Sequence, residues 1–207
     1  MSNITIPKQT QEIDTPEGIM NFLQKRNGQF TRNYKSRYSV TELVGCQRKS
    51  TYKQLGIPQE ELLADTTLES MWATVRGDFL HNMTYAYKWR EMDMEYYVPL
   101  DNGKIATLAG RLDMYDWKTK TIIDLKTTKD VYSQAQEGTI PKKEDILQIQ
   151  CYGTIFSSVI PVQELVLVYA DLNDMIAFRI VNEDKTWWLK ERILELYLNQ
   201  IYLGSGA

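Results

Sequence analysis

The most informative stretch of the chain spans residues 105–127 and reads IATLAGRLDMYDWKTKTIIDLKT. Apolar and polar side chains alternate through both of its halves, and this period of two predicts strands over 105–115 and 121–127. The second strand carries Asp124 and Lys126 on one face, because successive side chains of a strand point to opposite faces. A carboxylate and an amine therefore share one face of a strand whose other face is apolar.

The turn between these two strands sets which residues oppose each other. A turn centred on Lys118 and Thr119 places Asp113 directly opposite Asp124, because positions equidistant from a turn pair up. Carboxylates opposed across a ladder repel each other, and a divalent cation between them would remove the repulsion. A slip of one residue would separate the two acids. A metal site is therefore one interpretation of this hairpin.

Helices and strands of ordinary length surround the hairpin. Helices are predicted over 39–55, 66–90, 143–157 and 184–203, with a short one after Thr15-Pro16, and further strands over 96–100, 165–170 and 175–181. Asp101-Asn102-Gly103 is a hairpin signal, and Ser39 and Glu42 have the spacing of a capping box. This order of elements predicts the α/β (α+β) class.

The composition is that of an ordinary globular protein. Of the 207 residues, 43% are hydrophobic and 25% charged, which excludes disorder of the whole chain. No run approaches the roughly 20 apolar residues of a membrane span, and the start of the chain lacks an apolar signal core. We therefore expect no membrane partner and a cytoplasmic location, in the host cytoplasm if the protein is viral.

Positive charge is concentrated near the N-terminus. The net charge is −3, but residues 25–53 carry +7 and the remainder −10, with Tyr34, Tyr38 and Tyr52 among the bases. Such a segment suits a phosphate backbone and stackable bases; the alternative is a solvated surface. We expect a basic helical part over 1–64 and a core over 65–207 that together form one compact unit.

Other polar residues admit two interpretations each. His81 is the only histidine, and a lone histidine is more often structural than a ligand. Gly77 costs a helix about 1 kcal/mol relative to alanine, which close approach of another backbone or a ligand would explain. Gln148 and Tyr152 share a helix face, either as surface residues beside a core stripe or as substrate contacts.

Four motifs occur in a characteristic order between residues 38 and 152. They are Arg76-Gly77-x-x-x-His81, Gly110-x-x-Asp113, Asp124-x-Lys126 and Gln148-x-x-x-Tyr152. Together they resemble the RecB-type branch of the PD-(D/E)XK nuclease superfamily. The resemblance implies a restriction-endonuclease-like core, with a central mixed sheet flanked by helices. Within that branch the chain is most similar to the CRISPR-associated RecB-like exonucleases and their stand-alone relatives in phages and archaeal viruses.

An iron–sulfur cluster is not expected, although one motif resembles its first ligand. Ser39-x-x-x-Leu43-x-x-Cys46-x-Arg48-Lys49 is similar to the family's N-terminal motif, whose cysteine is a cluster ligand. The three later cluster cysteines are missing, because the only other cysteine, Cys151, lies within the Gln148 motif. One thiolate cannot hold a cluster that needs four ligands. We expect Cys46 to be a buried small residue.

The resemblance also implies roles for individual residues. The divalent ion, Mn²⁺ or Mg²⁺, would be held by His81, Asp113, Asp124 and the main-chain carbonyl of Leu125. Lys126 would orient or deprotonate the attacking water, acting with both aspartates as a catalytic group. Substrate contacts would come from Gln148, Tyr152, Arg76, Arg48 and Lys49, where Arg76 would hold a backbone phosphate or a carboxylate.

The expected function is a metal-dependent DNA nuclease that hydrolyses phosphodiester bonds, preferentially in single strands, as an exonuclease, an endonuclease or both. The resemblance suggests viral or mobile-element replication, recombination or CRISPR-related processing, with DNA and replication or recombination proteins as partners. One alternative is a non-catalytic single-stranded-DNA-binding or recombination accessory protein on the same scaffold. Another is an assembly protein that forms a homo-oligomer through Trp187-Trp188 and the last helix.

Overall fold

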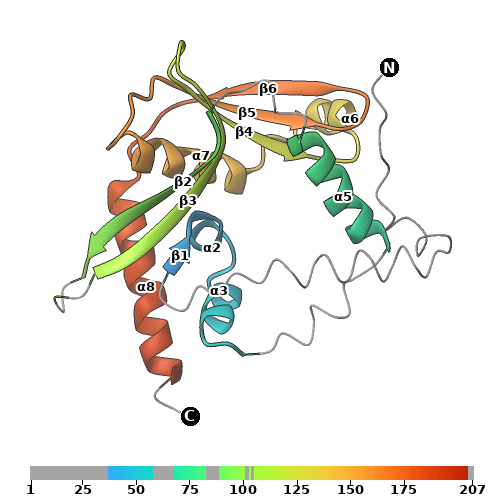
Figure 1. Ribbon diagram of the computed structural model, residues 1–207. Coiled ribbons are helices and arrows are strands. Elements are labelled where there is room, and N and C mark those ends of the chain that lie inside the picture. The colour runs from blue at the N-terminus through green and yellow to red at the C-terminus, as the bar shows by residue number, and fades with distance from the viewer. Residues whose placement is uncertain (1–36, 58–67, 83–88, 101–102, 104, 205–207) are drawn as a thin grey trace, which may run out of the picture.

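The computed structural model describes residues 37–57, 68–82, 89–100, 103 and 105–204 (Figure 1). The elements in chain order are β1 (Arg37–Ser39), α2 (Val40–Val44), α3 (Gln47–Gln54), α5 (Leu68–Asn82), β2 (Trp89–Pro99), β3 (Ile105–Asp116), β4 (Thr121–Thr127), α6 (Val131–Gln136), α7 (Lys143–Phe156), β5 (Glu164–Ala170), β6 (Met175–Ile180) and α8 (Thr186–Gly204). The short helix predicted after Thr15-Pro16 and the first bases of the 25–53 segment lie outside the described residues.

The strands form one mixed sheet. Its order is β1-β3-β4-β5-β6, and β2 pairs with the other edge of β3. The β1–β3 and β4–β5 pairs are parallel, whereas β2–β3, β3–β4 and β5–β6 are antiparallel. This architecture confirms the predicted α+β class with a mixed central sheet flanked by helices, and agrees with a restriction-endonuclease-like core.

Helices cover the two faces of the sheet unequally. The larger core joins Ile122 and Leu165 of the sheet to Ile149 of α7 and Ile193 of α8. A smaller cluster on the opposite face joins Leu125 and its neighbours to α5, which lies apart from α7 and α8 (Figure 1). Because Ile122 and Leu125 of one strand serve different cores, β4 is buried on both faces and holds its side chains firmly.

The N-terminal elements pack against the C-terminal half of the chain. The parallel pairing of β1 joins Arg37 to Thr107 of β3, α2 contacts α7, and α3 contacts α8. The Tyr38 hydroxyl donates to Gln200 Oε1 at 3.0 Å. Through these contacts α2 reaches the side chains that α7 presents.

Two predicted helices differ from those in the structure. The helix over 39–55 is divided into α2 and α3, because Gly45 has an extended backbone (φ −79°, ψ −167°) that ends the first. The capping box is confirmed: Glu42 N donates to Ser39 Oγ at 3.2 Å, and Ser39 N donates to Glu42 Oε2 at 2.9 Å. The helix over 66–90 was predicted too long, since residues 89 and 90 belong to β2, where pairing with β3 overrides local helical periodicity.

Three shorter features were also missed or misjudged. β1 and α6 were not predicted, because a strand of three residues carries little period of its own. Cys46 is exposed rather than buried, since it caps the start of α3 instead of lying inside a continuous helix. Cys151 lies in the core, as expected of a helix residue. Both cysteines are free thiols.

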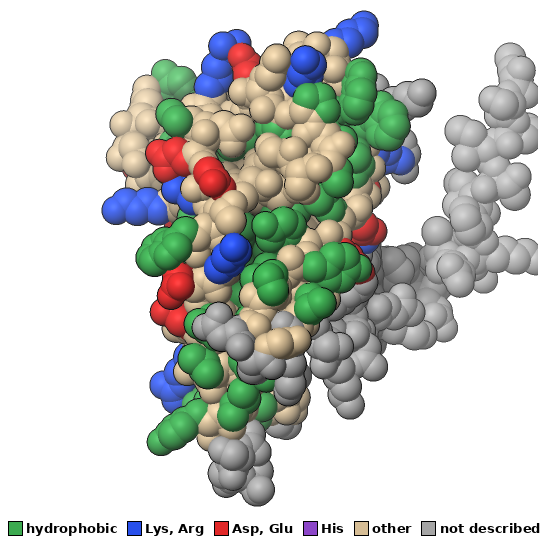
Figure 2. Space-filling view, turned by 90° about the vertical axis from the view of Figure 1, so that its left-hand side faces the viewer, with side chains coloured by type: hydrophobic (Ala, Val, Ile, Leu, Met, Phe, Trp, Pro, Cys, Tyr) green, Lys and Arg blue, Asp and Glu red, His purple; other side chains and the backbone are tan. Residues whose placement is uncertain are grey.

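Apolar side chains reach the surface on α8. Figure 2 shows the side of the molecule where α8 and the ends of β2 and β3 lie, with apolar side chains spread among charged ones. On α8, Leu198, Ile201 and Tyr202 are exposed, so the homo-oligomer stays a prediction that light scattering would test. Within the part of the chain that the structure describes, no helix is both long and apolar enough to cross a membrane.

Candidate functional site

The site lies where one edge of β3 loses its partners. Since β2 occupies the other edge, β1 and β4 share this one: β1 pairs with residues 107–109 and β4 with residues 114–116. Among the described strands nothing pairs with residues 110–113 on this edge, so β1 and β4 diverge around the Gly110-x-x-Asp113 motif. The sheet therefore forks at this motif.

The predicted register of the hairpin is confirmed. Met114 pairs with Ile123, which centres the turn between Lys118 and Thr119 and makes Asp113 and Asp124 the next positions in line. The ladder stops before them, as expected where two carboxylates would oppose each other. Asp113 Oδ2 instead accepts a hydrogen bond from the backbone N–H of Leu125 at 2.7 Å.

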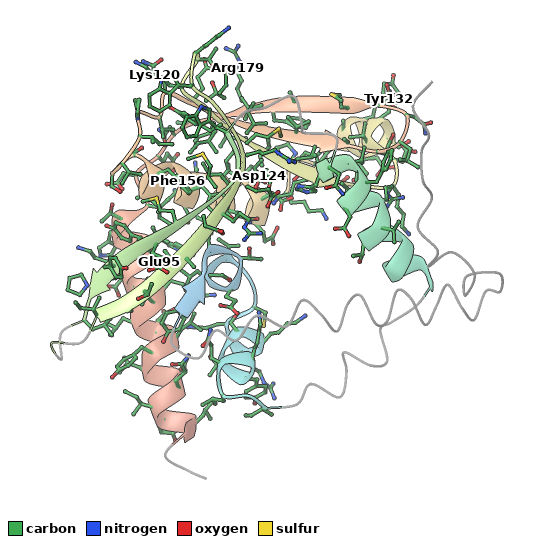
Figure 3. The ribbon with its side chains drawn as sticks, in the orientation of Figure 1. Glu95, Lys120, Asp124, Tyr132, Phe156 and Arg179 are labelled. Carbon is green, nitrogen blue, oxygen red and sulfur yellow. The ribbon has the colours of Figure 1, made fainter. Side chains whose placement is uncertain are left out.

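A cavity of about 460 Å³ opens at the fork. Seven residues with a predicted role line it: His81, Asp113, Asp124, Leu125, Lys126, Gln148 and Tyr152. Figure 3 shows Asp124 at the centre of the molecule, where β3, β4 and α7 come together. The sequence prediction missed other lining residues, among them Thr41, Arg111, Lys142, Asp145 and Tyr169. Arg111 occupies a variable position of the Gly110-x-x-Asp113 motif, whereas the other four lie outside the motifs and reach the cavity only through tertiary packing.

Lys126 is held by two acceptors on different elements. Its Nζ lies 2.7 Å from Asp124 Oδ2 on the same strand and donates to Gln148 Oε1 of α7 at 2.9 Å. Gln148 Nε2 in turn donates to the Tyr152 hydroxyl at 3.1 Å and to Thr41 Oγ1 of α2 at 3.3 Å. With both polar ends engaged, Gln148 orients the lysine ammonium.

The Gln148–Tyr152 pair is therefore not an exposed polar face. Gln148 is 9% exposed and Tyr152 5%, which rules out the first interpretation of these two residues as surface polar groups. Tyr152 also explains Gly110: a Cβ at that glycine would lie 3.3 Å from the tyrosine ring. The glycine of one motif thus accommodates the tyrosine of another. At Gly77 the fit is looser, since a Cβ would meet Thr127 at an ordinary 3.4 Å.

Two of the three catalytic candidates, Asp113 and Lys126, have shifted pKa values. Burial, assisted by the Asp124 carboxylate, raises the pKa of Asp113 from 3.8 to about 6. Burial lowers the pKa of the Lys126 amine, but Asp124 and the more distant Asp145 raise it by more, so the net pKa lies above its ordinary value. The amine is therefore charged at neutral pH. In the protein without a metal ion this charge fits the predicted role of orienting water, whereas a cation held by Asp113 and Asp124 would lower the pKa of the amine, so both predicted roles of Lys126 stay predictions.

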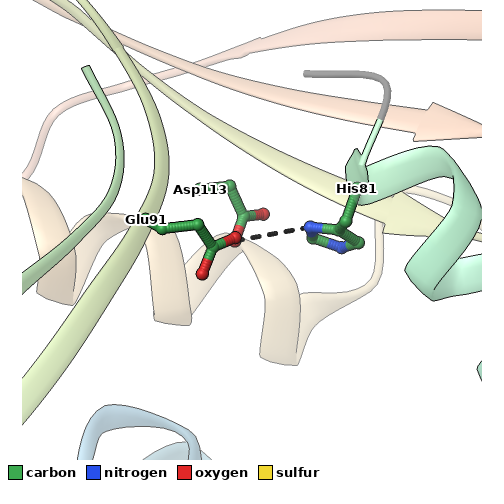
Figure 4. A group of neighbouring side chains, drawn as sticks. All are labelled: His81, Glu91 and Asp113. Carbon is green, nitrogen blue, oxygen red and sulfur yellow. Dashed lines mark ion pairs between the residues drawn. The ribbon is translucent and has the colours of Figure 1, made fainter. Parts of the chain in front are cut away.

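His81 faces Asp113 from α5. Its Nδ1 lies 3.8 Å from Asp113 Oδ1, and Glu91 of β2 brings a third ligand atom within 4.8 Å of both (Figure 4). Glu91 was not predicted, because the helix expected over 66–90 hid the start of β2. Extending the hairpin predicted at Asp101-Asn102-Gly103 back along the chain would have placed Glu91 opposite Asp113.

The donor set suits a hard divalent cation. The carboxylates of Asp113, Asp124 and Glu91, the His81 imidazole and a main-chain carbonyl from β4 are available around the fork, so every donor atom except the imidazole nitrogen is an oxygen. Oxygen ligands favour Mg²⁺ and Mn²⁺ over softer metals, and an imidazole is compatible with Mn²⁺. Burial and, after it, the neighbouring Asp124 carboxylate raise the pKa of Asp113, and a bound cation would favour the charged form that both disfavour. The residues present therefore fit the ion that the motifs imply.

Three predicted substrate contacts lie away from the cavity. Arg76 of α5 is half-buried and acts on Asp171, whose pKa is lowered mainly by three backbone N–H donors and further by the Arg76 guanidinium. Arg48 and Lys49 are exposed on α3. The Arg48 Nε donates to the Tyr52 hydroxyl at 3.2 Å, with the guanidinium 5.4 Å from the ring centre. Neither basic residue of α3 lines the cavity.

Comparison with known proteins supports the fold. The sequence matches no family model and no curated protein. The crystal structure of SSO0001 is similar with a TM-score of 0.65 at 19% identity, covering 88% of this chain and 87% of that one. The crystal structure of a phage-related exonuclease from Haemophilus somnus 129PT gives a TM-score of 0.49 at 16% identity, covering 84% and 97%. The similarity to SSO0001, at 19% identity, shows a shared fold.

Proposed function

We propose that the chain is a metal-dependent nuclease that hydrolyses phosphodiester bonds in DNA, preferentially in single strands. One observation carries the proposal: Asp113, Asp124 and Lys126 come from two strands to one cavity at the fork of the sheet. Two acids can hold a divalent ion, which activates water and neutralises charge at the phosphate. A charged lysine beside them adds a positive group next to the scissile bond. We infer a setting in viral or mobile-element replication, recombination or CRISPR-related processing, in the cytoplasm, from the motif resemblance.

His81, Asp113, Asp124 and the Leu125 carbonyl would hold a divalent ion. When bound, the ion would neutralise charge at the phosphate and lower the pKa of a water molecule. Asp113 is fixed for this role by its bond from the Leu125 N–H.

Lys126 contributes a fixed positive charge. Its ammonium has three hydrogens; one is donated to Gln148 Oε1, and an ion pair with Asp124 Oδ2 at 2.7 Å holds the group in place. A hydrogen that Gln148 does not take can be donated to a phosphate oxygen or to the attacking water. A preoriented donor in a partly desolvated cavity stabilises the negative charge that develops in the transition state.

Basic residues in the cavity wall and on α3 suit the binding of the DNA backbone. Lys142 lines the cavity, whereas Arg48 and Lys49 extend along α3. Since phosphate contacts make binding dependent on salt, reversing both charges on α3 should weaken DNA binding and reduce its salt slope while the rate of the bound complex is kept. An unchanged salt slope would remove α3 from the DNA path.

Cleavage of end-labelled single- and double-stranded DNA with Mn²⁺, Mg²⁺ or EDTA tests the proposal. The variant Lys126→Met keeps the side-chain volume and removes the charge, and Lys190→Met on the exposed face of α8 is its matched control. We expect metal-dependent cleavage that the first variant abolishes and the second retains, with DNA binding intact in both. If circular single strands are not cleaved, the enzyme is an exonuclease, because an exonuclease needs a free DNA end.

Two results would overturn the proposal. Near wild-type cleavage by Lys126→Met would place the chemistry elsewhere. Tight binding of single strands without cleavage by the wild-type protein in either metal would instead indicate the accessory DNA-binding protein.

A further inference from the structure

We propose that Glu91 is a metal ligand, and that with His81 and Asp113 it holds a second divalent cation on the α5 side of the fork. The inference rests on the proposed function and modifies its ligand set: His81 passes to the second ion, and Asp113, Asp124 and the Leu125 carbonyl hold the first. It adds a residue that lies in none of the four motifs, and it assigns two ions to the site.

The strand register brings Glu91 to Asp113. The pairs Arg90–Met114 and Met92–Leu112 flank these two residues in the β2–β3 ladder, so Glu91 is the residue opposite Asp113. The ladder is irregular at this position, because Glu91 has a left-handed backbone (φ 49°), yet its carboxylate lies beside that of Asp113. Figure 4 shows the two carboxylates side by side, with the His81 imidazole facing them from α5.

The three side chains are spaced for a cation. One ligand atom from each lies within 4.8 Å of the other two. Adjacent ligands of an ion with bonds of about 2.1 Å stand about 3.0–3.4 Å apart. The 3.8 Å between His81 Nδ1 and Asp113 Oδ1 would therefore have to shorten by about 0.4–0.8 Å on binding. Glu91 can approach by side-chain rotation, because it is 45% exposed.

The two oxygens of Asp113 serve different sides of the site. Oδ2 accepts from the Leu125 N–H on β4, next to Asp124. Oδ1 is the atom that faces His81 Nδ1 at 3.8 Å, too far for a hydrogen bond. One ion beside Asp124 and Leu125, and another beside His81 and Glu91, would then share the Asp113 carboxylate. Ions that share a carboxylate lie about 3.5–4 Å apart in two-metal hydrolases.

The neighbouring arginine does not compete strongly for Glu91. Arg111 donates to Asp93 through two bonds, of 2.7 and 3.0 Å, and its contact with Glu91 is 3.5 Å long. Both partners of that longer contact are more than a third exposed, and exposed ion pairs contribute little. The two shorter bonds of Arg111 thus go to Asp93, and a cation at Glu91 would displace only the single 3.5 Å bond from Arg111 Nη1 to Glu91 Oε2.

Counting bound Mn²⁺ by electron paramagnetic resonance tests the assignment on the full chain. We expect the wild-type protein to bind two ions, with an exchange-coupled spectrum from the shared carboxylate, and Glu91→Gln to bind one without coupling. Glu95→Gln, four residues further along β2, is the matched control and should keep two. His81→Gln should lose the same ion as Glu91→Gln, which provides a second variant if the first does not fold.

The number of Mn²⁺ ions bound distinguishes a failure of the second site from a failure of the proposed function. A single ion in the wild-type protein, or two coupled ions in folded Glu91→Gln, overturns the second site. If one ion binds and cleavage still depends on it, the nuclease proposal stands without Glu91. If no ion binds and no cleavage occurs, both proposals fall.

Discussion

Replacing Asp113 by asparagine should stabilise the protein in the absence of divalent metal. Burial and the Asp124 carboxylate raise the pKa of the Asp113 carboxyl from 3.8 to about 6. Ionisation of this group therefore opposes folding at neutral pH. Each tenfold change in proton affinity is worth about 1.4 kcal/mol, and the cost of the charge is therefore at most about 3 kcal/mol. Asparagine keeps an oxygen that can accept from Leu125 N–H, and the backbone contact is preserved.

The gain should depend on pH in a defined direction. Between about pH 4 and 6 the folded state holds a proton at Asp113 that the unfolded state has released. This contribution to stability is complete below the unfolded pKa and is lost as the pH rises through the folded value. The difference between Asp113→Asn and wild type should thus be near zero at pH 4 and reach its maximum above pH 7.

Thermal unfolding with EDTA, at several pH values, measures this difference. For a chain of this length 1 kcal/mol corresponds to about 2–4 °C in Tm, so the variant should unfold up to about 6–12 °C higher at pH 8. Mn²⁺ should raise the Tm of wild type more than that of the variant. Asp116→Asn is the control, because hydrogen bonds from Lys118 N–H and Thr119 lower the pKa of that exposed carboxyl. A variant less stable than wild type at pH 8, or a gain independent of pH, would refute the reasoning.

Two further substitutions and one thiol-labelling experiment test other parts of the structure. Gln148→Leu removes an acceptor of the Lys126 ammonium and should slow single-turnover cleavage by about 10- to 100-fold, whereas an unchanged rate would contradict the orienting role. Cys46 should react quickly with a thiol reagent because the Lys49 N–H lowers its pKa, while burial raises the pKa of Cys151 to about 12; equal rates would contradict this. Ser39→Ala should cost about 1 kcal/mol in urea unfolding by removing the cap of α2, with Ser39→Thr as control and a loss below about 0.3 kcal/mol as the contrary result.

Part of the site could be predicted because it depends on local geometry. The opposition of Asp113 and Asp124 follows from the symmetry of a hairpin about its turn, and the pairing of Met114 with Ile123 confirms it. The capping box likewise links Ser39 and Glu42, only three positions apart. In both cases the interacting residues are close along the chain, so the spacing alone constrains them.

Tertiary structure alone decided what surrounds these residues. The fork requires β1 to pair with a strand some seventy positions later, as Arg37 does with Thr107, and no local pattern encodes that pairing. The burial of Gln148 depends on α2 and α7 packing together. Glu91 becomes a neighbour of Asp113 only through the β2–β3 ladder. The sequence determined the acids and the lysine, while packing between distant segments determined what holds them, because long-range contacts depend on the assembled sheet rather than on periodicity.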